Sequence, residues 1–283
     1  MQSKILPYLR CPNDKGELVL RFRYGGRKKV DEEQLHCKAC SSDYQISKGI
    51  PILKKPVYLT LRDNLRIISW HQRSGKAEGI SAYEAEEMLV RRFESDDSEL
   101  YLANQEIPKE FRRMLGKTYS PILDMCSGHG CCIQDDLKAG ANEIYSTELD
   151  IMLLQAQDRI LTRIGQRNKV HLLCTDVFAL PFADNTFRYV TGHIGFNATS
   201  NPLRAMQEAR RVMQPNAHGV TLTLIGEGDD AYLKPPRNSA EGYKSLLEQA
   251  SLSVEEAISF SNNHPEAIKE KKTEFLLTKF RKV

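Results

Sequence analysis

The feature that most constrains this 283-residue chain is a short apolar stretch, residues 122–125, which leads directly into a loop of small residues, Cys126-Ser127-Gly128-His129-Gly130. Small residues let the backbone turn sharply and approach a ligand closely. The dinucleotide-binding fingerprint needs a third glycine where this chain has Ile133, so that pattern fails. Asp124, near the end of the apolar stretch, instead suits a ligand with a cationic amino group.

Strand-like and helix-like segments alternate from residue 121 to the C-terminus. Apolar stretches predict strands, and apolar stripes at helical spacing predict helices. We expect strands at 122–125, 143–148, 169–174, 187–191 and 219–225, and helices at 150–164 and 203–213. This alternation predicts an α/β fold, a mainly parallel sheet with helices on both faces. Ligands of such sheets bind outside the carboxyl ends of the strands.

An acidic residue ends or follows each of the first three expected strands: Asp124, Glu148 and Asp176. Glu148 can accept hydrogen bonds from a ribose diol. Asp176 can accept one from an adenine amino group, with Val177 and Phe178 flanking the ring. Any one of these acids alone is more often a surface residue in a loop. Together, and in this order, they match the amino acid, the ribose and the base of S-adenosylmethionine (SAM).

With these residues in place, residues 121–280 resemble the class I SAM-dependent methyltransferase superfamily, and the stretches 176–187 and 208–216 carry the likeness further. The resemblance implies a Rossmann-like, seven-stranded methyltransferase sheet with a terminal antiparallel strand at 273–280. Cys126 stands where the family usually has a glycine. The resemblance and the three acids give the expected cofactor-binding residues: Asp124, Cys126, Gly128, Gly130, Glu148, Leu149, Asp176, Val177, Phe178 and His193.

His193 and Asn197 are the polar residues expected nearest to the methyl-transfer centre, and we take them as the candidate catalytic residues. His193 can act as a general base near neutral pH, or contribute only its backbone. Methyl transfer from a sulfonium has an excellent leaving group, so alignment can supply most of the catalysis.

Three of the seven cysteines lie within the first forty residues. Cys37 and Cys40 have the C-x-x-C spacing of a zinc knuckle, while Cys11 is followed by Asp14 where a second cysteine would stand. A carboxylate can ligate zinc, so a Cys3Asp site is one reading. The alternative is a ribbon that has lost its metal and is held by a small core. His36 neighbours Cys37 on an expected strand and should point the other way.

Residues 1–55 resemble the small zinc-ribbon domain that activates tRNA, ribosomal and release-factor methyltransferases, through stretches such as 15–18 and 49–53. A ribbon followed by a methyltransferase also resembles the bacterial ribosomal guanine-N1 methyltransferases. We therefore expect a β-rich zinc-ribbon-like domain at 1–55 and a methyltransferase domain at 119–283. The helical pattern between them predicts a linker or lid at 56–118. Its rings should cover the cofactor: Trp70, His71, Tyr83 and Tyr101.

No long apolar run or secretion signal is visible, so the sequence predicts a cytoplasmic protein that does not enter the membrane. The leading hypothesis is a methyltransferase for a small-molecule acceptor. An RNA methyltransferase with the ribbon as RNA reader is an alternative, which a net charge of only +3 mildly disfavours. A non-catalytic SAM-binding adaptor is a third, which the three intact acids disfavour.

Overall fold

A computed structural model describes residues 3–24, 31–54, 90, 106–118, 120–195, 199–226, 235–261 and 273–283. The strands are β1 (Leu18–Tyr24), β2 (Asp31–Cys37), β3 (Asp43–Ser47), β4 (Ile50–Leu53), β5 (Ile122–Met125), β6 (Ile144–Glu148), β7 (Val170–Thr175), β8 (Phe187–His193), β9 (Met213–Gly226), β10 (Leu252–Ser261) and β11 (Thr273–Lys282). The α-helices are α3 (Glu106–Leu115), α4 (Cys131–Lys138), α5 (Ile151–Arg163), α6 (Pro202–Val212) and α7 (Ala240–Gln249). Short 3-10 helices are η1 (Ser3–Tyr8), η3 (Arg167–Lys169) and η4 (Val177–Ala179).

Seven strands form the methyltransferase-type sheet, in the order β7-β6-β5-β8-β9-β11-β10. Neighbouring strands from β7 to β9 pair in parallel, and β11 runs antiparallel to both β9 and β10. The sequence therefore predicted the α/β Rossmann-like sheet and its antiparallel terminal strand correctly. Within it, β5 and β7 are buried at every residue, as expected of parallel strands that are covered on both faces.

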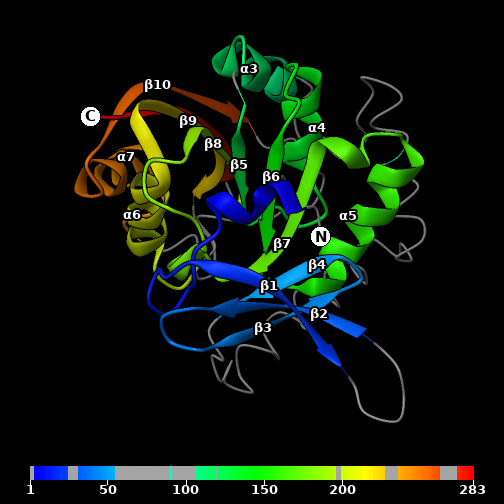
Figure 1. The fold of residues 1–283 in the computed structure, drawn as a ribbon. Coiled ribbons are helices and arrows are strands. Elements are labelled where there is room, and N and C mark those ends of the chain that lie inside the picture. The colour runs from blue at the N-terminus through cyan, green and yellow to red at the C-terminus, as the bar shows by residue number, and fades with distance from the viewer. Residues whose placement is uncertain are drawn as a thin grey trace.

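Helices cover both faces of this sheet: α4 and α5 lie on one side, and α6 and α7 on the other (Figure 1). Polar side chains start three of them, because a helix leaves its first N–H groups without partners. Asp150 caps α5, Asn201 caps α6 and Ser239 caps α7, each accepting a hydrogen bond from a backbone N–H. The connections that precede these helices are thereby fixed.

The N-terminal unit (the described residues within 3–54) is a β-rich unit, as expected, but it is continuous with the large sheet. Strands β1 to β4 pair antiparallel in succession. β4 then pairs in parallel with β7, through Ile52 with Cys174 and Leu53 with Thr175, which makes one sheet of eleven strands. Leu9 and Leu35 are buried in the same apolar cluster as Phe182. The unit and the methyltransferase sheet therefore share a core.

Most of the expected lid at 56–118, with Trp70, His71, Tyr83 and Tyr101, lies outside the described residues. Helix α3 is present where helical spacing predicted it. Its apolar face buries Ile107, Phe111 and Met114 in a cluster with residues of β9 and β11. None of the described helices combines the length and the apolar character needed to cross a lipid bilayer.

Candidate functional site

Left-handed backbone shapes the loop between β5 and α4. Gly128 and Gly130 have φ of 55° and 91°, and Cys126 has φ of 54°. A residue with a Cβ pays roughly 1–2 kcal/mol in this conformation, which explains why the related family prefers glycine at the position of Cys126. The loop after β8 leaves room for the Cys126 side chain, because a Cβ on Gly195 would lie only 2.9 Å from the Cβ of Cys126.

Hydrogen bonds from β6 and α5 hold this loop in place. The backbone N–H of Ser127 donates to the carbonyl oxygen of Thr147 at 3.0 Å, and the hydroxyl of Thr147 donates to the carbonyl oxygen of Asp124 at 2.9 Å. Gln157 on α5 donates to the carbonyl oxygen of Gly128 at 2.6 Å and accepts from the Ser146 hydroxyl at 2.7 Å. Protein contacts from both elements thus support the conformation of the loop.

Asp124 is completely buried at the end of β5, and neither carboxyl oxygen has a hydrogen-bond partner in the part of the chain that the structure describes. Burial, together with the nearby Glu148 carboxylate, raises the pKa of Asp124 to about 7. Asp136 on α4 is equally buried; it accepts a hydrogen bond from Thr191, the β8 residue that pairs with Asp124. An uncompensated buried carboxylate is unfavourable, so a cationic group would suit this position.

Glu148, the last residue of β6, connects two loops. One carboxylate oxygen accepts from the backbone N–H of Gly128 at 2.9 Å, and the other from Leu149 and Asp150 at 2.7 Å and 3.2 Å. Burial raises its pKa all the same. A carboxylate has about four lone-pair sites, so ribose hydroxyls can still bind it.

Asp176 directly follows β7 and caps the 3-10 helix η4. Its carboxylate accepts from the backbone N–H of Phe178 at 2.9 Å. Val177 and Phe178 are both half-buried. The structure thus brings Asp124, Glu148 and Asp176 to the carboxyl ends of three adjacent strands; we call the loops after β5, β6 and β7 the cofactor edge.

His193 ends β8, the strand beside β5, and so lies at the same edge of the sheet. Its ring packs edge-on against Phe111 of α3, with ring centroids 4.7 Å apart. Helix α3, which precedes β5 in the chain, therefore reaches this end of β8. Asn197 lies outside the described residues.

Gln157 is a site residue that the sequence reasoning missed. It is 1% exposed and bridges the loop after β5 to Ser146. A signal was available, because Gln157 occupies the apolar stripe of its helix between Leu153 and Ile160. A polar residue on a buried stripe indicates a specific hydrogen-bonding role.

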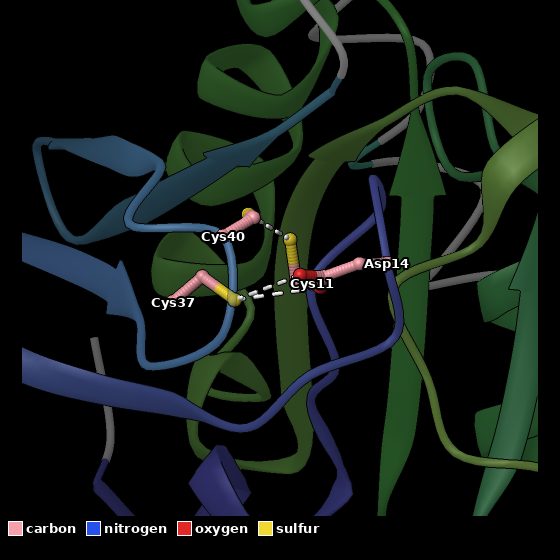
Figure 2. A group of neighbouring side chains, drawn as sticks. All are labelled: Cys11, Asp14, Cys37 and Cys40. Atoms are coloured by element: carbon pink, nitrogen blue, oxygen red, sulfur yellow. Dashed lines mark hydrogen bonds between the residues drawn. The ribbon is translucent and has the colours of Figure 1, made fainter.

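A second candidate site, the cysteine cluster, lies in the N-terminal unit. It consists of Cys11, Asp14, Cys37 and Cys40, whose potential ligand atoms all lie within 4.8 Å of one another and point toward a common centre (Figure 2). The Sγ atoms of Cys11 and Cys40 are 3.6 Å apart, and Cys37 Sγ is 3.4 Å from Asp14 Oδ1. Sulfur ligands about 2.3 Å from a tetrahedral zinc ion lie about 3.8 Å apart, so these spacings fit a metal.

The environment of the cluster is uneven. Cys11 and Cys37 are buried, whereas Asp14 and Cys40 are exposed. Burial raises the pKa of Cys11 to about 12, while the backbone N–H of Gly16 holds the pKa of Asp14 at about 2. Ionised Asp14 is a ready ligand, but Cys11 needs a cation to become a thiolate. His36 bonds Asp43 at 2.7 Å and is not part of the cluster, as its alternation with Cys37 predicted.

The order of the strands, with one reversed strand, defines the fold of the class I SAM-dependent methyltransferases. Residues 102–225 match the model of the ubiE/COQ5 methyltransferase family. The chain is 30% identical over 112 residues to a demethylmenaquinone methyltransferase of Chlamydia trachomatis. It is 32% identical over 104 residues to a ubiquinone/menaquinone biosynthesis C-methyltransferase of Roseobacter denitrificans.

These matches cover 37% and 36% of this chain, and 44% and 41% of the two relatives. The chain therefore spans less than half the length of the curated relatives that it matches. Among solved structures, a geranyl diphosphate C-methyltransferase of Streptomyces coelicolor superposes with a TM-score of 0.52 at 11% identity, over 62% of this chain and 77% of the other. That likeness supports the fold alone.

Proposed function

We propose that this protein is a methyltransferase that transfers the methyl group of SAM to a small-molecule acceptor. The observation that carries the proposal is the placing of Asp124, Glu148 and Asp176 at three adjacent strand ends around an ordered small-residue loop. The family match and the sequence relatives support the same activity. SAM would supply an activated methyl group on a sulfonium.

In this proposal, each acid binds one part of the cofactor. Asp124 binds the α-ammonium group, which supplies the cation that its buried carboxyl lacks. Glu148 accepts from the ribose hydroxyls, and Asp176 accepts from the adenine amino group between Val177 and Phe178. The remaining proposed contacts come from the loops: Cys126, Gly128, Gly130, Leu149 and His193. The site works by orienting the donor and excluding water, and His193 or Asn197 takes a proton only where the acceptor carries one of high pKa.

The names of the relatives direct the search for the acceptor. Both relatives are named for quinone-type molecules, which favours a small-molecule acceptor over RNA. We propose a demethylated quinone ring as the first acceptor class to test. The non-catalytic adaptor gains no support from these matches.

The decisive test measures transfer of labelled methyl from SAM to a panel of demethylated quinones, with total RNA and a metabolite extract in parallel. Label in a quinone or another small molecule is the expected result, and it should disappear in Asp176→Ala. Label in RNA alone would overturn the small-molecule assignment. Absence of S-adenosylhomocysteine binding by calorimetry would overturn the cofactor as well.

We also propose that the cysteine cluster binds one structural zinc ion through Cys11, Asp14, Cys37 and Cys40. The converging ligand atoms and their tetrahedral spacing support it. Metal analysis of protein purified without chelators should find about one zinc per chain. A folded protein with no metal would mean that the ribbon is held by its apolar core alone.

The proposed organisation keeps a zinc-ribbon-like part at 1–55, a helical linker or lid at 56–118, and the methyltransferase part at 119–283. We propose a cytoplasmic location, which is consistent with seven free cysteines.

A further inference from the structure

The walls of the proposed adenosine site both contact the N-terminal unit, a connection that no sequence pattern indicates. One wall is the turn Glu148-Leu149-Asp150 after β6. The other is Asp176 and η4 after β7, followed by residues 180–183, here called the 180–183 segment. The unit reaches both walls because β4 pairs with the outer edge of β7.

Lys54, the residue after β4, reaches the first wall. Its Nζ donates to the carbonyl oxygen of Leu149 at 3.2 Å. The Cys174 thiol lies 3.3 Å from the same oxygen, which ties the turn to β7. Leu149 also donates its N–H to Glu148. The ammonium group of Lys54 therefore holds Leu149, the residue next to the proposed ribose-binding Glu148.

Lys15 reaches the second wall. It follows Asp14 in the cysteine cluster, and its Nζ donates to the carbonyl oxygen of Leu180 at 3.0 Å, while lying 3.6 Å from Glu208 of α6. The Leu180 N–H donates to the same Glu208 at 2.9 Å. Lys15 therefore holds the residue that directly follows η4.

Backbone contacts extend this second attachment. The backbone N–H of Arg10 donates to the carbonyl oxygen of Pro181 at 2.9 Å. The backbone N–H of Ala183 donates to the carbonyl oxygen of Tyr8 at 3.1 Å. From the other side, Arg211 of α6 donates to the carbonyl oxygens of Leu180 and Phe182. The 180–183 segment is thus held between the N-terminal unit and α6.

We propose that the N-terminal unit is an integral part of the cofactor site, with Lys54 and Lys15 as positioning residues that fix the two walls of the adenosine pocket. This inference rests on the proposed function, because it assumes that SAM binds at the cofactor edge. It also assigns the unit a role that does not require an RNA partner. Neither lysine needs to touch the cofactor; each acts through a backbone carbonyl.

The test measures the dissociation constants of S-adenosylhomocysteine and methylthioadenosine by calorimetry, using the full chain. Lys54→Met and Lys15→Met keep the aliphatic stem and remove the donor. Each should weaken the binding of both ligands about five-fold, and the double variant about twenty-five-fold, because the two lysines act on separate walls. Both ligands contain adenosine, so equal losses locate the effect in that half.

Matched variants separate positioning from general loosening. Lys38→Met removes an exposed lysine of the same unit, paired with Glu17 at 2.9 Å, and should leave both affinities unchanged. Lys54→Arg and Lys15→Arg retain a donor and should recover most of the affinity. Asp124→Asn should weaken S-adenosylhomocysteine but not methylthioadenosine, which lacks the α-amino group of the amino acid part.

The outcomes distinguish this inference from the proposed function. If the wild type binds neither ligand, the proposed function fails. If the wild type binds both and the two methionine variants bind as tightly, the function stands and the positioning role is overturned. Losses that the arginine variants do not recover, or that Lys38→Met shares, would also overturn it.

Discussion

The cofactor edge and the cysteine cluster each bring acidic or thiol groups together, yet they are organised differently. At the cofactor edge, Glu148 accepts three backbone N–H donors and Gln157 secures the loop, so hydrogen bonds within the protein support the geometry. In the cysteine cluster, the contacts are between the candidate ligands themselves: Cys11 contacts Cys40, and Cys37 contacts Asp14.

The difference lies in what each site requires for stability. A pre-ordered site can lose its ligand and keep its shape, since its backbone groups are already bonded. A site whose ligand atoms converge on one centre gains its order from the ion, and metal affinity there contributes to folding. We therefore expect the cluster to govern stability and the cofactor edge to govern affinity.

The largest expected effect is on stability, in Cys37→Ser. Cys37 is completely buried, and its sulfur lies 3.4 Å from Asp14. Loss of this ligand should remove the zinc and lower the melting temperature by more than about 10 °C. Metal analysis and thermal unfolding measure both. Cys131→Ser, a half-buried cysteine outside the cluster, is the control and should retain the metal. Equal melting temperatures for the two variants would remove the contrast between the sites.

Glu148→Gln should mainly change affinity. The amide keeps the shape of the side chain, but it loses the charge and turns an N–H group toward backbone donors. We expect S-adenosylhomocysteine to bind about 100-fold more weakly, since hydrogen bonds to a charged group contribute about 1.5–3 kcal/mol each. Calorimetry measures the affinity, and thermal unfolding should show a much smaller drop than in Cys37→Ser. Unchanged binding would show that Glu148 only shapes the loop.

Asp124 should make cofactor binding dependent on pH. Its pKa of about 7 in the empty protein means that it is mostly protonated at pH 6, whereas an ammonium group binds the carboxylate. Binding at low pH must therefore release a proton, and affinity should fall about five-fold between pH 7 and pH 6, with little change between pH 8 and pH 7. Titrations at pH 6, 7 and 8 measure this, and Asp124→Asn should bind weakly with no such slope.

The same raised pKa affects the stability of the empty protein. A carboxyl whose folded pKa exceeds its unfolded value is protonated more readily when folded, so stability decreases as pH rises from about 4 to 7. Asp124→Asn should therefore unfold at a higher temperature than the wild type at pH 8. A lower temperature would indicate that Asp124 is already paired with a cation.

The smallest expected effect is in Gln157→Leu. The variant fits the apolar stripe of α5 but loses the bonds to Gly128 and Ser146. We expect about five-fold weaker binding of S-adenosylhomocysteine, equivalent to about 1 kcal/mol. Thr162→Val, elsewhere on α5, loses only a bond to the carbonyl of Asp158 and serves as the control. Equal effects of the two changes would show that the loop is ordered without Gln157.

Local patterns carried much of this structure. Apolar stretches located β5 to β8, and a capping residue with an apolar stripe located α5, because burial on a regular element leaves a regular spacing. The positions of Asp124, Glu148 and Asp176 at strand ends followed from the same reasoning. The sequence also marked the four residues of the cysteine cluster that the structure brings together, although zinc binding itself stays a prediction.

The pairing of β4 with β7 could not be predicted. Residues 50–53 read as an extended stretch, but nothing in four apolar residues names a partner strand far along the chain. Without that pairing, Lys54 had no visible neighbour at Leu149. Long-range pairing of this kind is decided by tertiary packing, here by the core that Leu9 and Phe182 share.

The position of β4 beside β7 also orders events during synthesis. β4 ends at Leu53, whereas β7 begins at Val170, so the N-terminal unit leaves the ribosome long before its partner strand. Strands β1 to β4 can form their meander early, because they pair with one another in succession along the chain, but β4 must keep an open edge until β7 arrives. An unpaired strand edge is a template for association with other chains. The nascent protein is therefore exposed to aggregation through β4 during that interval. The interval ends when β7 pairs with the open edge of β4.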